Sequence, residues 1–401
     1  MPNQFNTVPE AIAAIKAGKM VIVADNEDRE NEGDLICAAE LVTPEIINFM
    51  ATEGRGLICM PISREIAGSL GLELMTQRSN DCIETAFTIS IDGSYDKGVG
   101  TGISALDRAN TIRLCMQDET KPDDLRKPGH IFPLIAKDHG VLVRTGQTES
   151  AVDLARLAGL KPGGVICEIV NPDGTMARRD DLFEFSAKFD IPFITVEQII
   201  EYRLQNEILV KREAEADLPT EYGDFRIYAF TEVISGKEHL ALVYGDLDKA
   251  SPVLVRSHSE CLTGDALASL RCDCRLQLKD AMERIVAEGS GVLLYLRQEG
   301  RGIGLVNKIK AYTLQDQGLD TNEANERLGF KADLREYWVG AHILKDLDIP
   351  QIRLLTNNPN KLAEFERYGI KVVSREPSVH ITNHNHHYLN VKKVKSNHLI
   401  A

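Results

Sequence analysis

The chain has 401 residues, of which 43% are hydrophobic, and a formal net charge of −14 at pH 7. This length and hydrophobic content allow two or three globular domains with sizeable cores. The negative charge argues against a general nucleic-acid-binding protein, which normally presents a basic face. An anionic small molecule can still bind where arginine, lysine or a metal ion offsets the charge locally.

No segment of the sequence reads as a membrane span or a secretion signal. Residues 1–18, MPNQFNTVPEAIAAIKAG, lack the basic segment and apolar stretch of a secretory signal. No apolar run approaches the roughly 20 residues that a membrane helix requires. We therefore expect a cytoplasmic protein that binds neither membrane nor nucleic acid. Five cysteines lie among apolar neighbours, as reduced core thiols do: Cys37, Cys59, Cys82, Cys115 and Cys167.

Segments rich in Val and Ile alternate with segments whose apolar residues recur at helical spacing. In the first half, strands are predicted over residues 18–25, 56–62, 86–92, 139–146 and 164–170, and helices over residues 43–54, 103–116, 148–160 and 179–189. In the second half, strands are predicted over residues 225–233, 238–246, 252–258, 292–298 and 352–358. Between the halves, residues 195–217 read as a charged helix that leads into a linker.

The alternation of strands and helices in both halves predicts the fold class. No fixed-period repeat is present. We expect an α/β and α+β protein of two domains, each a mixed sheet covered by helices. The predicted boundaries are residues 1–205 for the first domain, 206–222 for the linker and 223–401 for the second domain.

Three cysteines gather in SECLTGDALASLRCDC, residues 259–274: Cys261, Cys272 and Cys274. Their spacing differs from the paired C-x2-C of structural zinc modules, and no fourth cysteine follows. Three thiolates with an open fourth position would bind a catalytic zinc ion, which generates a hydroxide-like nucleophile near neutral pH. Two alternatives stay open, namely ordinary buried cysteines and a closed site completed by His258.

Two loops downstream suit an anionic ligand. RQEGRGIG, residues 297–304, combines three glycines, which let the backbone approach a ligand, with two arginines, whose forked donors suit phosphate. It lacks the G-x4-G-K-[ST] spacing of a P-loop. LLTNNPNK, residues 354–361, places Thr356 and Lys361 on a turn between a strand and a helix. Either loop could also be a simple turn.

These segments, together with KIKAYTLQDQGLDTNEANERLGF, closely resemble GTP cyclohydrolase II over residues 220–395. The resemblance implies that the three cysteines hold a catalytic zinc ion, with water in the fourth position. It also implies the reaction: the imidazole ring of GTP is opened, formate and pyrophosphate are released, and a diaminopyrimidine ribotide enters riboflavin synthesis. The implied GTP contacts are Arg256, Ser257, His258, Ser259, Glu260, Gln277, Glu299, Gly300, Arg301, Thr321, Thr356 and Lys361.

Three further residues match catalytic positions of that family. Asp333 matches the general base, Arg335 the nucleophile toward the α-phosphate, and Tyr312 a tyrosine near the reacting ring. A carboxylate can move protons, whereas a guanidinium is a poor nucleophile and a good phosphate clamp. Without the resemblance, Asp333 and Arg335 would be interpreted as the solvated start of a helix, and Tyr312 as an aromatic residue at the edge of the core.

The acidic segment DRENEGD, residues 28–34, follows a predicted strand. Carboxylates this close together suit Mg²⁺, which prefers oxygen ligands; the alternative is a solvated acidic turn. His130 lies on a Pro-Gly turn in PGHIFPL. Glu168 lies in an apolar strand, where burial would raise its pKa and favour acid–base chemistry. Glu168 could also face solvent, and His130 could be an ordinary loop histidine.

Together with AFTISID, TGISALDRANTI and CEIVNPDGTMAR, these motifs resemble 3,4-dihydroxy-2-butanone 4-phosphate synthase over about residues 5–200. The resemblance implies that ribulose 5-phosphate is converted, with Mg²⁺ or Mn²⁺, to the butanone phosphate and formate. It makes His130 and Glu168 essential and Glu30 a metal ligand. The whole chain is similar to a fusion of the two riboflavin enzymes, which suggests a homodimer. The implied substrate contacts are Arg29, Glu30, Asp34, Arg144, Thr145, Gly146, Gln147, Thr148 and Glu168.

One position departs from the synthase pattern. The family reads G-H-T-E, and its histidine is the second metal ligand; here RTGQTES has Gln147 in that place. An amide oxygen can ligate Mg²⁺, but glutamine cannot act as a base near pH 7. We therefore expect an impaired or silent synthase half. Gly100, where the family usually has threonine, is a smaller departure.

Three functional hypotheses follow from these patterns. The leading one is an enzyme with both activities. In the second, only the cyclohydrolase works and the N-terminal half is a scaffold, which Gln147 favours. The third is a non-catalytic module that binds zinc and a nucleotide. The histidines of residues 380–387 are expected to form a polar loop rather than a metal site.

Overall fold

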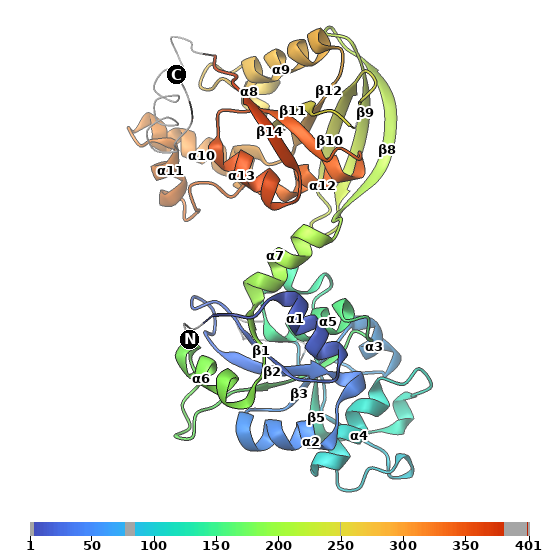
Figure 1. The fold of residues 1–401 in the computed structure, drawn as a ribbon. Helices are drawn as coiled ribbons and strands as arrows, with labels where there is room; N and C mark the ends of the chain where they lie inside the picture. Colours follow the sequence, from blue (N-terminus) through green and yellow to red (C-terminus); the bar gives the residue numbers. More distant parts are fainter. Residues whose placement is uncertain (1–3, 77–84, 249, 381–398, 400–401) are drawn as a thin grey trace. The chain divides into compact units, whose positions relative to one another are not determined.

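The computed structural model of the chain describes residues 4–76, 85–248, 250–380 and 399. The chain divides into two compact units, Met1–Arg203 and Leu204–Ala401, each built on a seven-stranded sheet (Figure 1). Among the described residues, no helix combines the length and apolar character that crossing a membrane requires. Cys82 and residues 381–387 of the histidine-rich segment lie outside the described residues.

The first unit has a mixed sheet in the order β4-β5-β3-β6-β2-β1-β7. The pairs β1–β7 and β3–β5 are parallel, and the pairs β1–β2, β2–β6, β3–β6 and β4–β5 are antiparallel. The strands are β1 (Val21–Ala24), β2 (Gly33–Ala38), β3 (Cys59–Ile62), β4 (Ile91–Gly93), β5 (Leu125–Ile135), β6 (Gly164–Glu168) and β7 (Phe193–Thr195).

Helices cover both faces of this sheet, so that two apolar cores form. The helices are α1 (Val8–Lys16), α2 (Pro44–Phe49), α3 (Arg64–Ser69), α4 (Ala105–Cys115), α5 (Gln147–Leu157), α6 (Arg179–Phe189) and α7 (Val196–Asn206). Along β1, Ile22 packs into the core that includes α2, α4 and α6, whereas Val21 and Val23 pack into the core of α1, α5 and α7. A strand buried on both faces reads as a continuous apolar run, which explains the sequence of β1.

The second unit has a mixed sheet in the order β14-β13-β11-β12-β10-β9-β8. Its strands are β8 (Val210–Pro219), β9 (Asp224–Glu232), β10 (Glu238–Tyr244), β11 (Val253–Ser259), β12 (Gly291–Leu296), β13 (Gln351–Leu355) and β14 (Lys371–Glu376). Its helices are α8 (Leu262–Asp265), α9 (Cys274–Glu288), α10 (Leu305–Asp316), α11 (Thr321–Arg327), α12 (Trp338–Asp346) and α13 (Pro359–Arg367). The predicted class, two domains that each combine a mixed sheet with helices, is confirmed.

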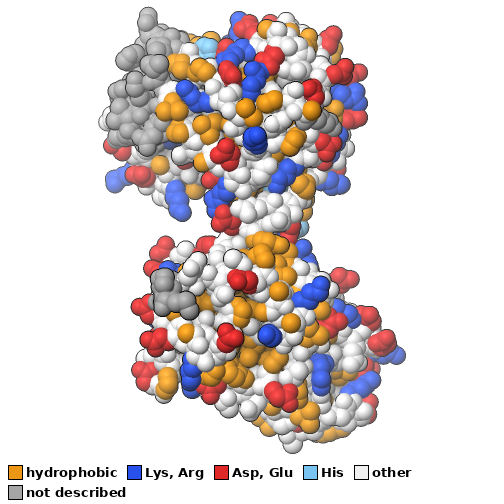
Figure 2. All heavy atoms as spheres, in the orientation of Figure 1, with side chains coloured by type: hydrophobic (Ala, Val, Ile, Leu, Met, Phe, Trp, Pro, Cys, Tyr) orange, Lys and Arg blue, Asp and Glu red, His pale blue; other side chains and the backbone are white. Residues whose placement is uncertain are grey.

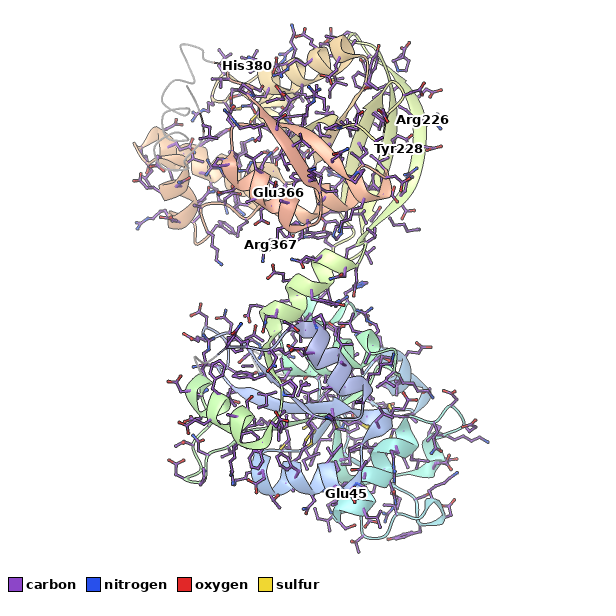
Figure 3. All side chains as sticks on the ribbon, viewed as in Figure 1. Glu45, Arg226, Tyr228, Glu366, Arg367 and His380 are labelled. Atoms are coloured by element: carbon purple, nitrogen blue, oxygen red, sulfur yellow. The ribbon has the colours of Figure 1, made fainter. Side chains whose placement is uncertain are left out.

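The predicted linker, residues 206–222, is wrong as a linker because most of it is strand β8. The helix predicted to run to residue 217 ends at Asn206, and β8 then pairs antiparallel with β9 along its length. β8 is an edge strand whose residues are almost all exposed, so it lacks the apolar alternation that reveals a strand. Figure 3 labels Arg226 and Tyr228 on β9; Arg226 bonds β8 carboxylates, and the Arg212 guanidinium lies 5.0 Å from the Tyr228 ring centroid.

Other element predictions differ from the structure for local reasons. Residues 139–146, predicted as a strand, contain a 3-10 helix, η5 (Gly140–Leu142), because the Asp153 carboxylate accepts the Val141 N–H at 2.9 Å and replaces a strand partner. The strand predicted over residues 86–92 is reduced to β4. β2 and β5 were not predicted: β2 begins inside the acidic segment, and β5 contains the Pro-Gly sequence before His130.

His342 fastens the start of the second unit to α12. Its ring is buried, its Nδ1 accepts the Leu209 N–H at 3.1 Å, and its Nε2 lies 2.7 Å from the Leu204 carbonyl oxygen, to which it donates. This pattern requires the neutral ring with a proton on Nε2. Burial lowers the pKa of His342 from its ordinary value of 6.5 to about 4.

The pKa of His342 predicts a loss of stability in mild acid. Because the folded state disfavours the charged ring, its contribution is complete above about pH 6.5 and is lost as the pH falls toward 4. The shift corresponds to roughly 3 kcal/mol. We expect His342→Gln, which keeps one acceptor and one donor without titrating, to flatten the pH dependence of the unfolding free energy between pH 7 and 4.5. Urea unfolding followed by the fluorescence of Trp338 measures this; parallel curves for both proteins would contradict it.

Candidate active sites

The three clustered cysteines converge at one point of the second unit. Cys261 follows β11, Cys274 begins α9, and their sulfurs and that of Cys272 all lie within 4.8 Å of one another. Gly264 lies beneath them, and a Cβ there would come within 2.9 Å of the Cys272 sulfur and 3.0 Å of the Cys261 sulfur. Three sulfur donors in one cluster fit zinc, which favours thiolate ligands in tetrahedral sites.

The cluster stabilises one thiolate more than the others. Hydrogen bonds from Cys272 and Cys274, and then the Lys308 ammonium, hold the pKa of Cys261 far below its ordinary value. The same contacts with Cys261 raise the pKa of Cys272 to about 11 and raise the pKa of Cys274. These contacts favour the thiolate form of Cys261, and zinc binding releases protons from the thiols that become its ligands.

Asp265 organises the backbone around Cys261. Its carboxylate accepts the Cys261 N–H at 3.0 Å and the Tyr295 hydroxyl at 3.0 Å, and it lies 3.0 Å from His258 Nε2. Within the described residues, His258 is not part of the group that could share a metal ion with the cysteines. The alternative of a closed site completed by His258 is thus not supported, because neither of its ring nitrogens is grouped with the three sulfurs. Burial also lowers the pKa of His258.

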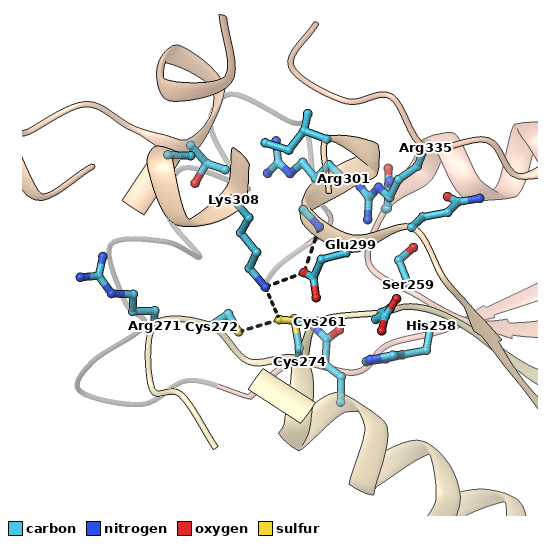
Figure 4. A pocket seen from close by; sticks show the side chains of 18 of the residues that line it. His258, Ser259, Cys261, Arg271, Cys272, Cys274, Glu299, Arg301, Lys308 and Arg335 are labelled. Carbon is cyan, nitrogen blue, oxygen red and sulfur yellow. Dashed lines mark hydrogen bonds and ion pairs between the residues drawn. The ribbon is translucent and has the colours of Figure 1, made fainter. Parts of the chain in front are cut away.

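A single pocket joins the cysteine cluster to most of the predicted GTP contacts (Figure 4). Ser257 and Asp333 are not among its lining residues. Asp333 is instead hydrogen-bonded to Arg335, which does line the pocket. Its walls come from β11, α9, α10, α11, the turn before α13 and residues 297–304, called the Gly-rich loop below. The predicted residues that line it are Arg256, His258, Ser259, Glu260, Cys261, Cys272, Cys274, Gln277, Glu299, Gly300, Arg301, Tyr312, Thr321, Arg335, Thr356 and Lys361.

The strand residues beside the pocket carry polar atoms without partners. Arg256 Nε, Ser257 Oγ, His258 Nδ1 and Ser259 Oγ are buried and have no hydrogen-bond partner among the described residues. Arg256 is fixed through its other nitrogens, which donate to the Leu355 carbonyl oxygen and to the Gln277 side chain. Buried polar atoms are nearly always paired, so these groups are available to a bound ligand.

Asp333 and Arg335 form a two-point ion pair. Arg335 Nε lies 2.9 Å from Asp333 Oδ1, and Arg335 Nη2 lies 2.6 Å from Asp333 Oδ2. Burial acts to raise the pKa of Asp333, but the Arg335 contacts outweigh it, and the pKa lies below its ordinary value. Asp333 is therefore ionised at neutral pH. Tyr312 donates to or accepts from Thr263 Oγ1 at 3.0 Å, and burial raises its pKa.

In the first unit, two predicted carboxylates face each other across β2 and β6. Asp34 and Glu168 are register partners. Asp34 is fully buried, and burial followed by the charge of Glu168 raises its pKa well above the ordinary value. Glu168 is only half-buried, and its Oε2 accepts the Leu57 N–H at 2.8 Å. The buried carboxylate expected from the apolar strand is thus Asp34 rather than Glu168.

Arg29 brings the two predicted Mg²⁺ ligands together. Its guanidinium lies 3.0 Å from Glu30 Oε1, 3.2 Å from Gln147 Oε1 and 2.8 Å from Asp25 Oδ2. Gln147 is buried, and its Nε2 has no partner among the described residues. Both predicted Mg²⁺ ligands therefore contact the same guanidinium in the structure.

The remaining synthase residues lie around the start of α5 and on β5. Gly146 precedes α5, and a Cβ there would come within 2.4 Å of Arg144 Nη1. Thr145 and Thr148 flank it at the helix N-terminus, where phosphate is favoured. His130 Nδ1 lies 2.8 Å from Asp92 Oδ2, a contact that orients the imidazole ring.

At Gly100, an added Cβ would meet the Asp107 carboxyl group in ordinary contact, with Oδ2 at 3.4 Å. This glycine is therefore the milder of the two departures from the synthase pattern.

Sequence reasoning missed four residues that contact the predicted site residues: Asp92, Asp265, Tyr295 and Lys308. Only Lys308 had a usable signal, since it precedes Tyr312 by four residues and so lies on the same face of a helix. The others act through contacts between segments that are distant in the sequence.

Comparison with known proteins covers both units. Residues 9–202 match the family of 3,4-dihydroxy-2-butanone 4-phosphate synthase, and residues 211–377 match that of GTP cyclohydrolase II. A riboflavin biosynthesis protein RibBA of Bacillus velezensis is 54% identical over 398 residues, which is 99% of each chain. The RibBA protein of Synechocystis is 54% identical over 99% of this chain and 72% of its own length.

A solved structure is also similar. The crystal structure of RibBX, a two-domain 3,4-dihydroxy-2-butanone 4-phosphate synthase from A. baumannii, is 38% identical, with a TM-score of 0.65, and covers 93% of this chain and 100% of that one. With both family matches in the same order as the two units, and relatives that align from end to end, the chain belongs to the family of bifunctional riboflavin biosynthesis proteins RibBA.

Proposed function

We propose that the second unit is a zinc-dependent GTP cyclohydrolase II. It opens the imidazole ring of GTP, releases formate and pyrophosphate, and leaves 2,5-diamino-6-ribosylamino-4(3H)-pyrimidinone 5′-phosphate. The observation that carries this proposal is the three-cysteine cluster inside a pocket that also presents arginine and lysine side chains. The family match over residues 211–377 supports it.

Different residues of the pocket would serve different steps of GTP ring opening. Cys261, Cys272 and Cys274 would hold zinc, which when bound supplies a Lewis acid and an activated water. The ionised Asp333 can accept a proton, and Arg335, which lines the pocket, would offer its positive charge to the α-phosphate. The other predicted contacts on the pocket wall, Arg256, Arg301 and Lys361 among them, would bind and orient the nucleotide.

The first unit is, on this proposal, a 3,4-dihydroxy-2-butanone 4-phosphate synthase acting on ribulose 5-phosphate. Arg144 and the N-terminus of α5 would hold the phosphate. On this proposal, Asp34, whose pKa is raised by burial, and His130, whose ring contacts Asp92, would exchange protons with the sugar. The family match over residues 9–202 supports this assignment.

A second candidate is a chain in which only the cyclohydrolase works. It is favoured by Gln147 itself, whose amide oxygen is a weaker ligand for Mg²⁺ or Mn²⁺ than a histidine nitrogen and also accepts a hydrogen bond from Arg29. The first unit would then serve as a scaffold. In either case we propose a cytoplasmic homodimer whose small-molecule partners are GTP and ribulose 5-phosphate. The interspersed acidic and basic side chains on the face drawn in Figure 2 suit a protein with no nucleic-acid partner.

Removal of the zinc site should separate the two activities. We expect Cys274→Ser to lose bound zinc and formate release from GTP, while formate release from ribulose 5-phosphate is unchanged from the wild-type rate. Metal content by mass spectrometry and formate by NMR are the measurements, with Cys115→Ser, which changes a buried thiol of the first unit, as the control. One zinc per chain in a wild-type protein that does not open GTP would favour a non-catalytic zinc and nucleotide-binding module.

A further inference from the structure

Lys308 ends between the cysteine cluster and the Gly-rich loop (Figure 4). Its side chain projects from α10 and is 11% exposed. Its Nζ lies 3.1 Å from Cys261 Sγ and 2.7 Å from Glu299 Oε1. A lysine ammonium is almost never buried to this degree unless its charge is paired. Cys261 and Glu299 are therefore the partners that allow the lysine to be buried here.

Glu299 extends this contact to the backbone of the zinc-ligand segment. Its Oε2 accepts the N–H of Leu262, the residue after Cys261, at 2.6 Å, and its Oε1 also accepts the Gly300 N–H at 3.0 Å. Both carboxylate oxygens are thus occupied within the protein. Lys308 and Glu299 form a closed set of contacts that links α10, the Gly-rich loop and the segment that carries Cys261.

The charge balance shows why such a cation is useful. Three thiolates around one divalent ion leave a net charge of about −1, and the sulfurs repel one another as they come together. An ammonium group in contact with one sulfur reduces that repulsion and fixes the position of the sulfur. Groups that contact metal ligands in this way commonly tune metal affinity.

We propose that Lys308 is a positioning residue of the zinc site, which it assembles together with Glu299 by holding the Cys261 thiolate. The proposal rests on the assignment of zinc to the three cysteines and adds a residue that the GTP-binding pattern does not contain. It also gives Glu299 a role in building the site rather than in contacting the nucleotide.

Zinc affinity of the full-length protein tests this without any turnover of GTP. We expect Lys308→Gln to bind zinc about 10–100-fold more weakly than the wild type in competition with a chromophoric chelator. Lys308→Arg, which keeps the charge, should retain most of the affinity. Lys310→Gln removes an exposed lysine from the same helix and should change nothing. Circular dichroism checks that each variant is folded.

Glu299→Gln provides a second route if Lys308→Gln does not fold. This variant should also weaken zinc binding, and the double variant should lose less than the sum of the two single losses, because the pair acts together. Unchanged zinc affinity in both single variants overturns the proposal, whether or not GTP binds more weakly. A wild-type protein that binds zinc but does not open GTP would overturn the proposed function and leave this comparison intact.

Discussion

Gln147→His is expected to raise the Mn²⁺ affinity of the first unit, and its rate of formate release from ribulose 5-phosphate, about 10–100-fold. In the wild-type protein, the amide oxygen of Gln147 accepts a hydrogen bond from Arg29 at 3.2 Å, and its buried Nε2 is a donor that cannot ligate a cation. A neutral histidine presents a nitrogen lone pair to the metal ion. Because Glu30 is close to the same guanidinium, a second strong ligand would favour the metal ion over the arginine.

Zinc-loaded protein is the right material for this comparison, because the cysteine cluster is then already occupied. Electron paramagnetic resonance measures free Mn²⁺, and NMR measures formate. Gln147→Asn, which keeps the amide but shortens the side chain, is the matched control and should not gain affinity. Equal affinity and rate in the wild type and Gln147→His would contradict the account of this position. Formate release in the variant alone would establish the scaffold hypothesis for the natural chain.

Arg335→Met is expected to lower kcat/KM for GTP about 10²–10³-fold, as the loss of a transition-state donor typically does. Arg335 lines the pocket and grips Asp333 through two hydrogen bonds. Its removal should also let the pKa of Asp333 rise, since burial then acts without the compensating guanidinium. The acidic limb of the pH–rate profile should therefore move to higher pH.

Steady-state kinetics measured across pH distinguish transition-state stabilisation from ground-state binding by Arg335. The variants Arg335→Lys and Arg327→Met are measured alongside Arg335→Met. Arg335→Lys keeps the charge but not the fork, so we expect intermediate activity. Arg327 is exposed on α11, and its replacement should leave the kinetics unchanged. A rise in KM with unchanged kcat in Arg335→Met would contradict transition-state stabilisation and assign the residue to ground-state binding.

The sequence predicted those features that depend on local pattern. The spacing of Cys261, Cys272 and Cys274 placed three thiols together because a short helix and a turn return the chain to the same point, and the structure gathers their sulfurs there. The mixed sheets were predictable because their central strands are apolar on both faces. The residues of the nucleotide pocket were predicted from the resemblance of their motifs to GTP cyclohydrolase II. The spacing of these residues alone would not have identified them as ligand contacts.

The features that sequence reasoning missed depend on partners distant in the chain. β8 was read as a linker because both of its faces are solvated and charged. Residues 139–146 do not form the predicted strand, because the Asp153 carboxylate accepts the Val141 N–H. Asp92, which orients the His130 ring, lies on a strand 38 residues earlier in the chain. Likewise, nothing in the local pattern around Arg29 indicates that its guanidinium meets Gln147, 118 residues away.

Formate release from each substrate is the most direct test of the bifunctional assignment. The purified zinc-loaded protein would be incubated with GTP and, separately, with ribulose 5-phosphate and Mg²⁺, and formate followed by proton NMR. The account predicts formate and pyrophosphate from GTP, dependent on the cysteine cluster, and slower formate release from ribulose 5-phosphate that Gln147→His accelerates. No formate from GTP with one zinc bound per chain would contradict it.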